Sequence, residues 1–149
     1  MIFKTTKTMR LLKLFKVSAF LVALAGCSMV SGCDKTDTEN VDATEVNAIL
    51  VGKWHLMREG EADMSSEENY VTFSEDGSLI YEMVIDGEKT TLKRLYAVDD
   101  NWNWSEKEKT YTGTIRDYAS SSDQHISCTI TGNMLTTVDA SVERVYKKI

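Results

Sequence analysis

Short β-forming segments separated by turn sequences fill the C-terminal part of this chain, and their spacing strongly limits its possible folds. Asp76-Gly77 and Asp86-Gly87 are tight-turn pairs, because glycine accepts the positive φ angle that such a hairpin turn requires. Strands that recur about every 8–12 residues between turn signals indicate a barrel or a sandwich. The expected strands are Gly52–Arg58, Tyr70–Phe73, Leu79–Ile85, Lys89–Val98, Trp102–Ser105, Thr110–Arg116, His125–Thr131, Met134–Val138 and Val142–Lys148.

Consecutive hairpins without a long crossover favour the simplest topology, an up-and-down meander whose first and last strands pair. Such closure removes the exposed sheet edges that invite aggregation. The sequence therefore predicts an all-β domain over residues 48–149, a small antiparallel up-and-down barrel of about eight strands. A segment of this length is long enough for one modest hydrophobic core.

The first 33 residues have the pattern of a secretory signal. Five basic residues precede an uncharged stretch, Val17–Gly26, and no acidic residue occurs before Asp34. The uncharged stretch is shorter than the roughly 20 residues that a permanent membrane-spanning helix needs. A charged start, a short apolar segment and small residues at its end are typical of a cleaved signal peptide, which we exclude from the fold.

Two cysteines at the end of this segment resemble the bacterial lipobox, in which a small residue precedes a cysteine that is diacylated after cleavage. Leu24-Ala25-Gly26-Cys27 is favoured by its leucine and by the adjoining apolar run, and Val30-Ser31-Gly32-Cys33 by the acidic, polar residues that follow it. Either Cys27 or Cys33 is thus the expected lipid-attachment residue. The resemblance implies a lipoprotein of the cell envelope, anchored by acyl chains such as palmitate, most simply in the outer membrane of a Gram-negative bacterium.

Residues 34–47 are polar and acidic, and we expect a flexible tether between anchor and domain. An alternative interpretation is a short helix over Ala43–Leu50 that plugs the end of the domain, with Thr44 or Asp42 as its N-cap.

The net charge of the chain excludes one class of partner. Five of the 17 Lys and Arg residues precede Asp34, so the remainder carries 12 of them against 23 Asp and Glu, a net charge of −11. Such a surface repels phosphate backbones, and nucleic acid is therefore not an expected partner.

Gly52-Lys53-Trp54, at the entry to the first expected strand, resembles the Gly-x-Trp motif of lipocalins and lipocalin-like domains. In that family the tryptophan plugs the closed end of the barrel, and a basic residue of the last strand lies across its ring. The resemblance covers residues 48–149 and implies that Gly52, Trp54 and Arg144 form this closure. A guanidinium group over an indole ring contributes about 0.5–2 kcal/mol.

Aromatic residues of the middle strands are candidates for lining the mouth of such a barrel. Trp102, Trp104, Tyr96 and Tyr111 supply the aromatic surface typical of ligand pockets, although the same residues could serve only as core or rim packing. We expect a domain that binds a small apolar or amphipathic ligand. The alternative is a structural or protein-interaction lipoprotein with a filled barrel, and the sequence specifies no protein partner.

No pattern of catalytic or metal-binding residues is found in the sequence. The acidic loop Glu59–Glu68 matches no calcium-loop spacing, and His55 and His125 are the only histidines. Nucleophile and phosphate-loop motifs are missing as well, so we expect no enzyme activity and no cofactor. Cys128 alternates in phase with Ile126 and Ile130 and is expected to be a buried small hydrophobic residue.

Overall fold

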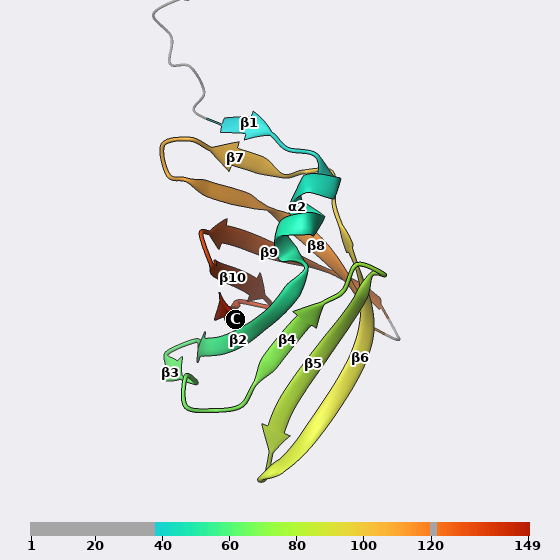
Figure 1. Ribbon diagram of the computed structural model, residues 1–149, viewed down its shortest axis with the longest axis vertical. Helices are drawn as coiled ribbons and strands as arrows, with labels where there is room; N and C mark the ends of the chain where they lie inside the picture. Colours follow the sequence, from blue (N-terminus) through green and yellow to red (C-terminus); the bar gives the residue numbers. More distant parts are fainter. Residues whose placement is uncertain (1–37, 120–121) are drawn as a thin grey trace, which may run out of the picture. The chain divides into compact units, whose positions relative to one another are not determined.

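The barrel closes where its last strand pairs with its first. A computed structural model describes residues 38–119 and 122–149, and in it eight strands pair antiparallel in chain order. The ring closes because β11 pairs with β2. This confirms the predicted all-β, up-and-down barrel (Figure 1). The ring strands are β2 (Gly52–Glu59), β4 (Tyr70–Phe73), β5 (Ser78–Ile85), β6 (Glu88–Val98), β8 (Thr110–Ala119), β9 (Ser122–Thr131), β10 (Met134–Asp139) and β11 (Val142–Lys148).

Three short strands lie outside the ring. β7 (Asn103–Ser105) pairs with the first residues of β8, and β1 (Thr38–Asn40) pairs with β7. β3 (Ala62–Asp63) pairs with the end of β2. The expected strand near Trp102 is therefore present as β7, but it extends one side of the sheet instead of forming part of the barrel wall.

Ala43–Leu50 forms helix α2, which is the alternative interpretation of this part of the chain and not the flexible tether. The Asp42 side chain caps it by accepting a hydrogen bond from the Thr44 backbone N–H at 2.7 Å. Val46 and Leu50 are completely buried in the domain core. Residues 38–47, which the expected boundary at Ala48 leaves outside the domain, are therefore part of the described fold.

Trp54 seals the end of the barrel that α2 covers. Its side chain is fully buried, and its Nε1–H donates to the Leu50 carbonyl at 2.8 Å. The Lys148 ammonium lies 5.1 Å from the centroid of the Trp54 ring and donates to the Ile49 carbonyl at 2.7 Å. Lys148, and not the expected Arg144, is thus the basic residue across the ring.

The reason for this difference is the register of the two strands. Lys148 is the β11 residue opposite Trp54, whereas Arg144 is opposite Glu59 at the other end of β2. Gly52 makes room for the lysine stem, because a Cβ atom at that position would lie 2.9 Å from the Lys148 Cε atom. Gly52 also has a φ of +133°, which side chains disfavour.

Trp102 packs into a space that a second glycine leaves open. Gly113 lies on the same side of β8 as buried Ile115, and the Trp102 ring covers it. The Trp102 Nε1–H donates to the Thr114 carbonyl at 2.9 Å. Cys128, opposite Gly113 on β9, is buried as expected, and burial raises the pKa of its thiol to about 12.

Thr38–Ile149 forms one compact unit, which holds the strand pairings and the hydrophobic core described above. The expected signal peptide, residues 1–33 with Cys27 and Cys33, lies outside the described residues, as do residues 34–37. No helix in the described ranges is long and apolar enough to span a membrane.

The contact between Trp102 and Gly113 yields a prediction about stability. A Cβ atom at Gly113 would lie 2.5 Å from the Trp102 ring, so Gly113→Ala forces a large buried side chain to move. We expect a loss of about 1–3 kcal/mol in the free energy of unfolding, measured by urea denaturation. In a Trp102→Ala background, where the obstacle is absent, the same change should cost much less. Equal costs in both backgrounds would contradict this packing.

Candidate ligand-binding cavity

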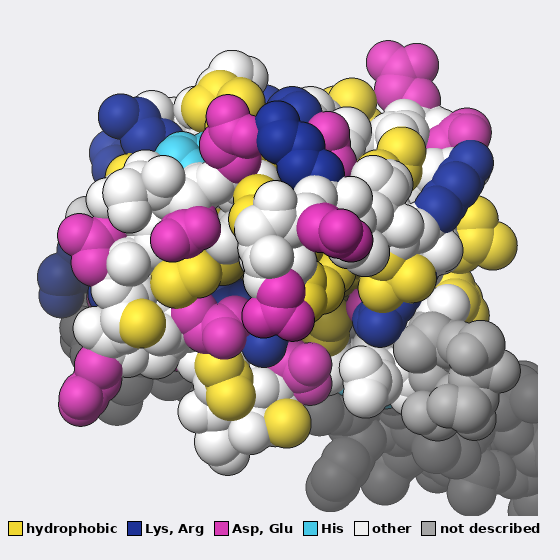
Figure 2. All heavy atoms as spheres, turned by 90° about the horizontal axis from the view of Figure 1, so that it is seen from below, with side chains coloured by type: hydrophobic (Ala, Val, Ile, Leu, Met, Phe, Trp, Pro, Cys, Tyr) yellow, Lys and Arg dark blue, Asp and Glu magenta, His cyan; other side chains and the backbone are white. Residues whose placement is uncertain are grey.

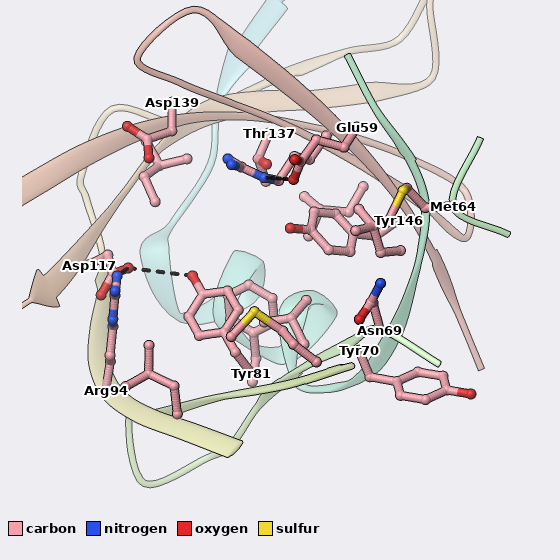
Figure 3. A pocket seen from close by; sticks show the side chains of 18 of the residues that line it. Glu59, Met64, Asn69, Tyr70, Tyr81, Arg94, Asp117, Thr137, Asp139 and Tyr146 are labelled. Carbon is pink, nitrogen blue, oxygen red and sulfur yellow. Dashed lines mark hydrogen bonds and ion pairs between the residues drawn. The ribbon is translucent and has the colours of Figure 1, made fainter. Parts of the chain in front are cut away.

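The barrel encloses a cavity of about 460 Å³ at the end away from α2. All eight ring strands contribute to its wall, and Figure 3 looks along the cavity with α2 behind it. Its inner part is formed by buried apolar side chains, among them Phe73, Ile115 and Leu135. Ile85 and Leu92 also line it but are 50% and 38% exposed, so the β5–β6 hairpin forms part of the mouth.

The protein surface seen from the β5–β6 hairpin side carries many charged side chains. Figure 2 shows acidic and basic side chains interspersed over this face, with hydrophobic side chains visible in a recess between them. The chain beyond residue 33 has a net negative charge, and a ligand passes this charged surface before it reaches the apolar interior.

One polar cluster within the cavity is centred on Asp117 of β8. This side chain is buried, with 1% of the residue exposed, and its Oδ2 atom accepts a bond from the Arg94 Nη1–H at 2.8 Å. The Tyr81 hydroxyl points at the same oxygen atom from 3.4 Å (Figure 3). Asp117 Oδ1 is buried and has no hydrogen-bond partner among the described residues.

A second polar pair lies across the cavity, where β11 meets the end of β2. The Arg144 Nε–H donates to Glu59 Oε2 at 2.7 Å, and Asp139 is a further carboxylate of the lining. The cavity wall thus holds three carboxylates and two guanidinium groups, an excess of one negative charge. Arg144, expected at the closed end, therefore belongs to the cavity.

Two tyrosine hydroxyls are further polar groups of the interior, which Asn69, Gln124 and Thr137 also line. Burial raises the pKa of Tyr146 to about 12, and burial followed by the charge of Asp117 raises the pKa of Tyr81 still further. Both phenols therefore stay protonated at neutral pH and can donate or accept hydrogen bonds. The cavity is apolar over most of its wall, with a few polar groups at fixed places, as small-molecule sites usually are.

The four aromatic residues expected to line the site lie elsewhere. The Tyr96 hydroxyl donates to Asn47 of α2 at 2.6 Å, and Trp102 fills the space beside Gly113. Trp104 of β7 stacks against Tyr111 of β8, with ring centroids 4.5 Å apart. None of the four is among the residues that line the described cavity.

Strand alternation carried a signal for the residues that the sequence reasoning missed. Arg94 is in phase with buried Tyr96 on β6, and Asp117 is in phase with buried Ile115 on β8. Opposite charges at inward positions of two strands are unusual in a barrel core, and they pair once those strands become neighbours. The neighbouring relation of β6 and β8 was hidden because β7 intervenes in the sequence.

The two histidines take part in structural contacts. The His55 ring lies 4.9 Å from the Tyr70 ring and forms a hydrogen bond of 2.7 Å with the Glu67 carbonyl. His125 lies 3.0 Å from an oxygen of Asp99 on the outside of the barrel. Within the described ranges, no three His, Cys, Asp or Glu side chains are grouped so as to hold a metal ion.

The raised pKa of Tyr146 predicts how stability depends on pH. Because the folded-state value of about 12 exceeds the ordinary value of about 10, the neutral phenol stabilises the fold below pH 10. This contribution is lost as the pH rises from about 10 through 12, by at most about 2–3 kcal/mol. Tyr146→Phe should therefore lose less unfolding free energy over this range than wild type. The same change at exposed Tyr118 is the control, and identical pH profiles for all three proteins would contradict the assignment.

Comparison of the chain with protein-family models, curated proteins and solved structures gave no match. The function must therefore be inferred from the residues that form the cavity.

Proposed function

We propose that this protein is an envelope lipoprotein whose barrel binds one small apolar or amphipathic molecule. The observation that carries the proposal is the cavity of about 460 Å³, which lies within the size range of roughly 300–1,000 Å³ typical of small-molecule sites. Side chains of all eight ring strands line it, and most of its wall is apolar.

Burial of a hydrocarbon chain supplies the affinity in this proposal. Each methylene group that moves from water into the cavity contributes about 0.8 kcal/mol, which is about fourfold in the dissociation constant. The affinity of a series of single-chain ligands should therefore rise with chain length until the cavity is full. A barrel with a filled interior, the structural alternative, offers no such dependence.

Membrane anchoring is the second half of the proposal and rests on the sequence. The basic, apolar and lipobox-like segments of residues 1–33 precede the polar residues 34–37 in the sequence, and the described domain follows them. An anchored barrel of this kind would hold its ligand at the membrane surface, where apolar molecules are concentrated.

Binding can be measured with the neutral fluorescent probe N-phenyl-1-naphthylamine and a form of the protein that starts at Asp34. We expect saturable binding to wild type and a loss of at least tenfold in affinity for Met83→Lys, because half-buried Met83 lines the cavity and an ammonium group in its wall opposes apolar ligands. Thr91→Lys, an exposed position on the outer side of β6, is the matched control and should bind as wild type does. Probe affinity unaffected by Met83→Lys would refute binding in this cavity.

The anchor is tested by mass spectrometry of the mature protein purified from bacterial membranes. We expect an N-terminal cysteine that carries acyl chains, either Cys27 or Cys33. Replacing the acylated cysteine by serine should release the protein from the membrane fraction, whereas replacing the other should not. A mature chain that begins elsewhere and carries no acyl group would contradict the lipoprotein assignment.

A further inference from the structure

Asp117 is the one buried carboxylate in the described barrel whose hydrogen bonding is incomplete. Its Oδ2 atom is bound by Arg94 and faces the Tyr81 hydroxyl, but its Oδ1 atom has no partner among the described residues. Buried polar atoms in native proteins nearly always have a hydrogen-bond partner. Asp117 lines the cavity, but its Oδ1 atom has less than 1 Å² of accessible surface, so a ligand supplies the missing donor when the carboxylate turns Oδ1 toward it.

Arg94 offers the complementary group beside it. A guanidinium group has five N–H donors, and within the described residues only the Nη1 group forms a hydrogen bond, to Asp117. With Oδ1 turned toward the cavity, the pair presents this acceptor next to N–H donors of Arg94. A hydroxyl group matches both, because its O–H can donate to the carboxylate while its oxygen accepts from the guanidinium.

Charge distinguishes a hydroxyl from the ionised head groups of common amphiphiles. Arg94 and Asp117 neutralise each other, so a carboxylate ligand would place a second negative charge directly beside Asp117. An ammonium head group would instead be placed beside Arg94. Burying a charge without a partner of opposite sign is costly, whereas an uncharged hydroxyl adds none.

Resting on the proposed ligand-binding function, we propose that the barrel selects uncharged, hydroxyl-bearing amphiphiles, whose hydroxyl binds between Asp117 and Arg94 while the hydrocarbon chain occupies the apolar cavity. Fatty-acid anions and alkylamines of equal length are then poor ligands. Ethers of similar length, which accept but cannot donate a hydrogen bond, leave Asp117 Oδ1 unpaired and are also poor ligands.

The test is displacement of N-phenyl-1-naphthylamine from the form starting at Asp34 by 1-decanol, 1-methoxydecane, decanoate and decylamine at pH 8. We expect 1-decanol to displace the probe at a concentration about tenfold below that of 1-methoxydecane, because only the alcohol donates to Asp117. This comparison uses two uncharged ligands and the wild-type protein, so it depends on no variant.

Asp117→Asn tests the charge argument. Removing the carboxylate leaves Arg94 without its counter-charge, so the preference for 1-decanol over decanoate should fall by about tenfold. Asp139→Asn is the matched control, since it removes a carboxylate of the same cavity that does not pair with Arg94, and the preference should change by less than about twofold. Thermal unfolding of both variants establishes that they are folded.

The possible results separate this inference from the function on which it rests. If the neutral probe does not bind to wild type, the proposed function itself fails. If the probe binds but 1-methoxydecane displaces it as well as 1-decanol does, or decanoate or decylamine is the best competitor, the hydroxyl site is refuted while ligand binding stands. A preference for 1-decanol that Asp117→Asn and Asp139→Asn reduce equally would also refute it.

Discussion

The pairing of β11 with β2 is the constraint on which the rest of the structure depends. Once the ring is closed, every second residue of each strand faces an interior that must be either packed or left hollow. At one end the interior is packed, because α2 and Trp54 fill it and Lys148 binds both. At the other end none of the described helices or strands covers the apolar wall, and the cavity lies there. The same register places Lys148 beside Trp54 and Arg144 beside Glu59, so one strand supplies both the closure and part of the cavity.

Local sequence signals sufficed for the fold because they act over short distances. The Asp-Gly pairs set the hairpins, and strand alternation by itself predicts that Cys128 and Ile126 face inward, where both are buried. The cavity depends on relations between distant residues, and these are not visible in a single segment. Arg94 and Asp117 pair only because β6 and β8 are neighbours, and Lys148 replaces Arg144 because of the strand register. The aromatic content led to the prediction that Trp102 and Trp104 line the ligand site. Trp102 instead packs against Gly113, and Trp104 of β7 packs against Tyr111 outside the ring of barrel strands.

An ion pair inside a barrel has a cost that an apolar pair of similar volume would avoid. Desolvation of Asp117 and Arg94 offsets much of their attraction, so such a pair is weak support for stability. The pair does, however, hold polar groups at a fixed place in the cavity wall, as polar groups that orient ligands are held in small-molecule sites. The site that we propose for the ligand would thus lie where the ion pair lowers local stability, as functional sites commonly do.

The burial of Cys128, opposite Gly113 in the β8–β9 pair, also determines how the domain behaves towards oxidants. Thiols form disulfides through the thiolate, and a group with a pKa of about 12 in a closed core supplies almost none. Cys128 is the one cysteine after Cys33, and extracytoplasmic compartments favour disulfide formation. In the cell envelope, the location that we propose, this thiol can form a wrong disulfide only until the barrel has closed. Rapid folding after export is then its protection, and a core mutation that slows folding would lead to crosslinked chains as well as to unstable ones.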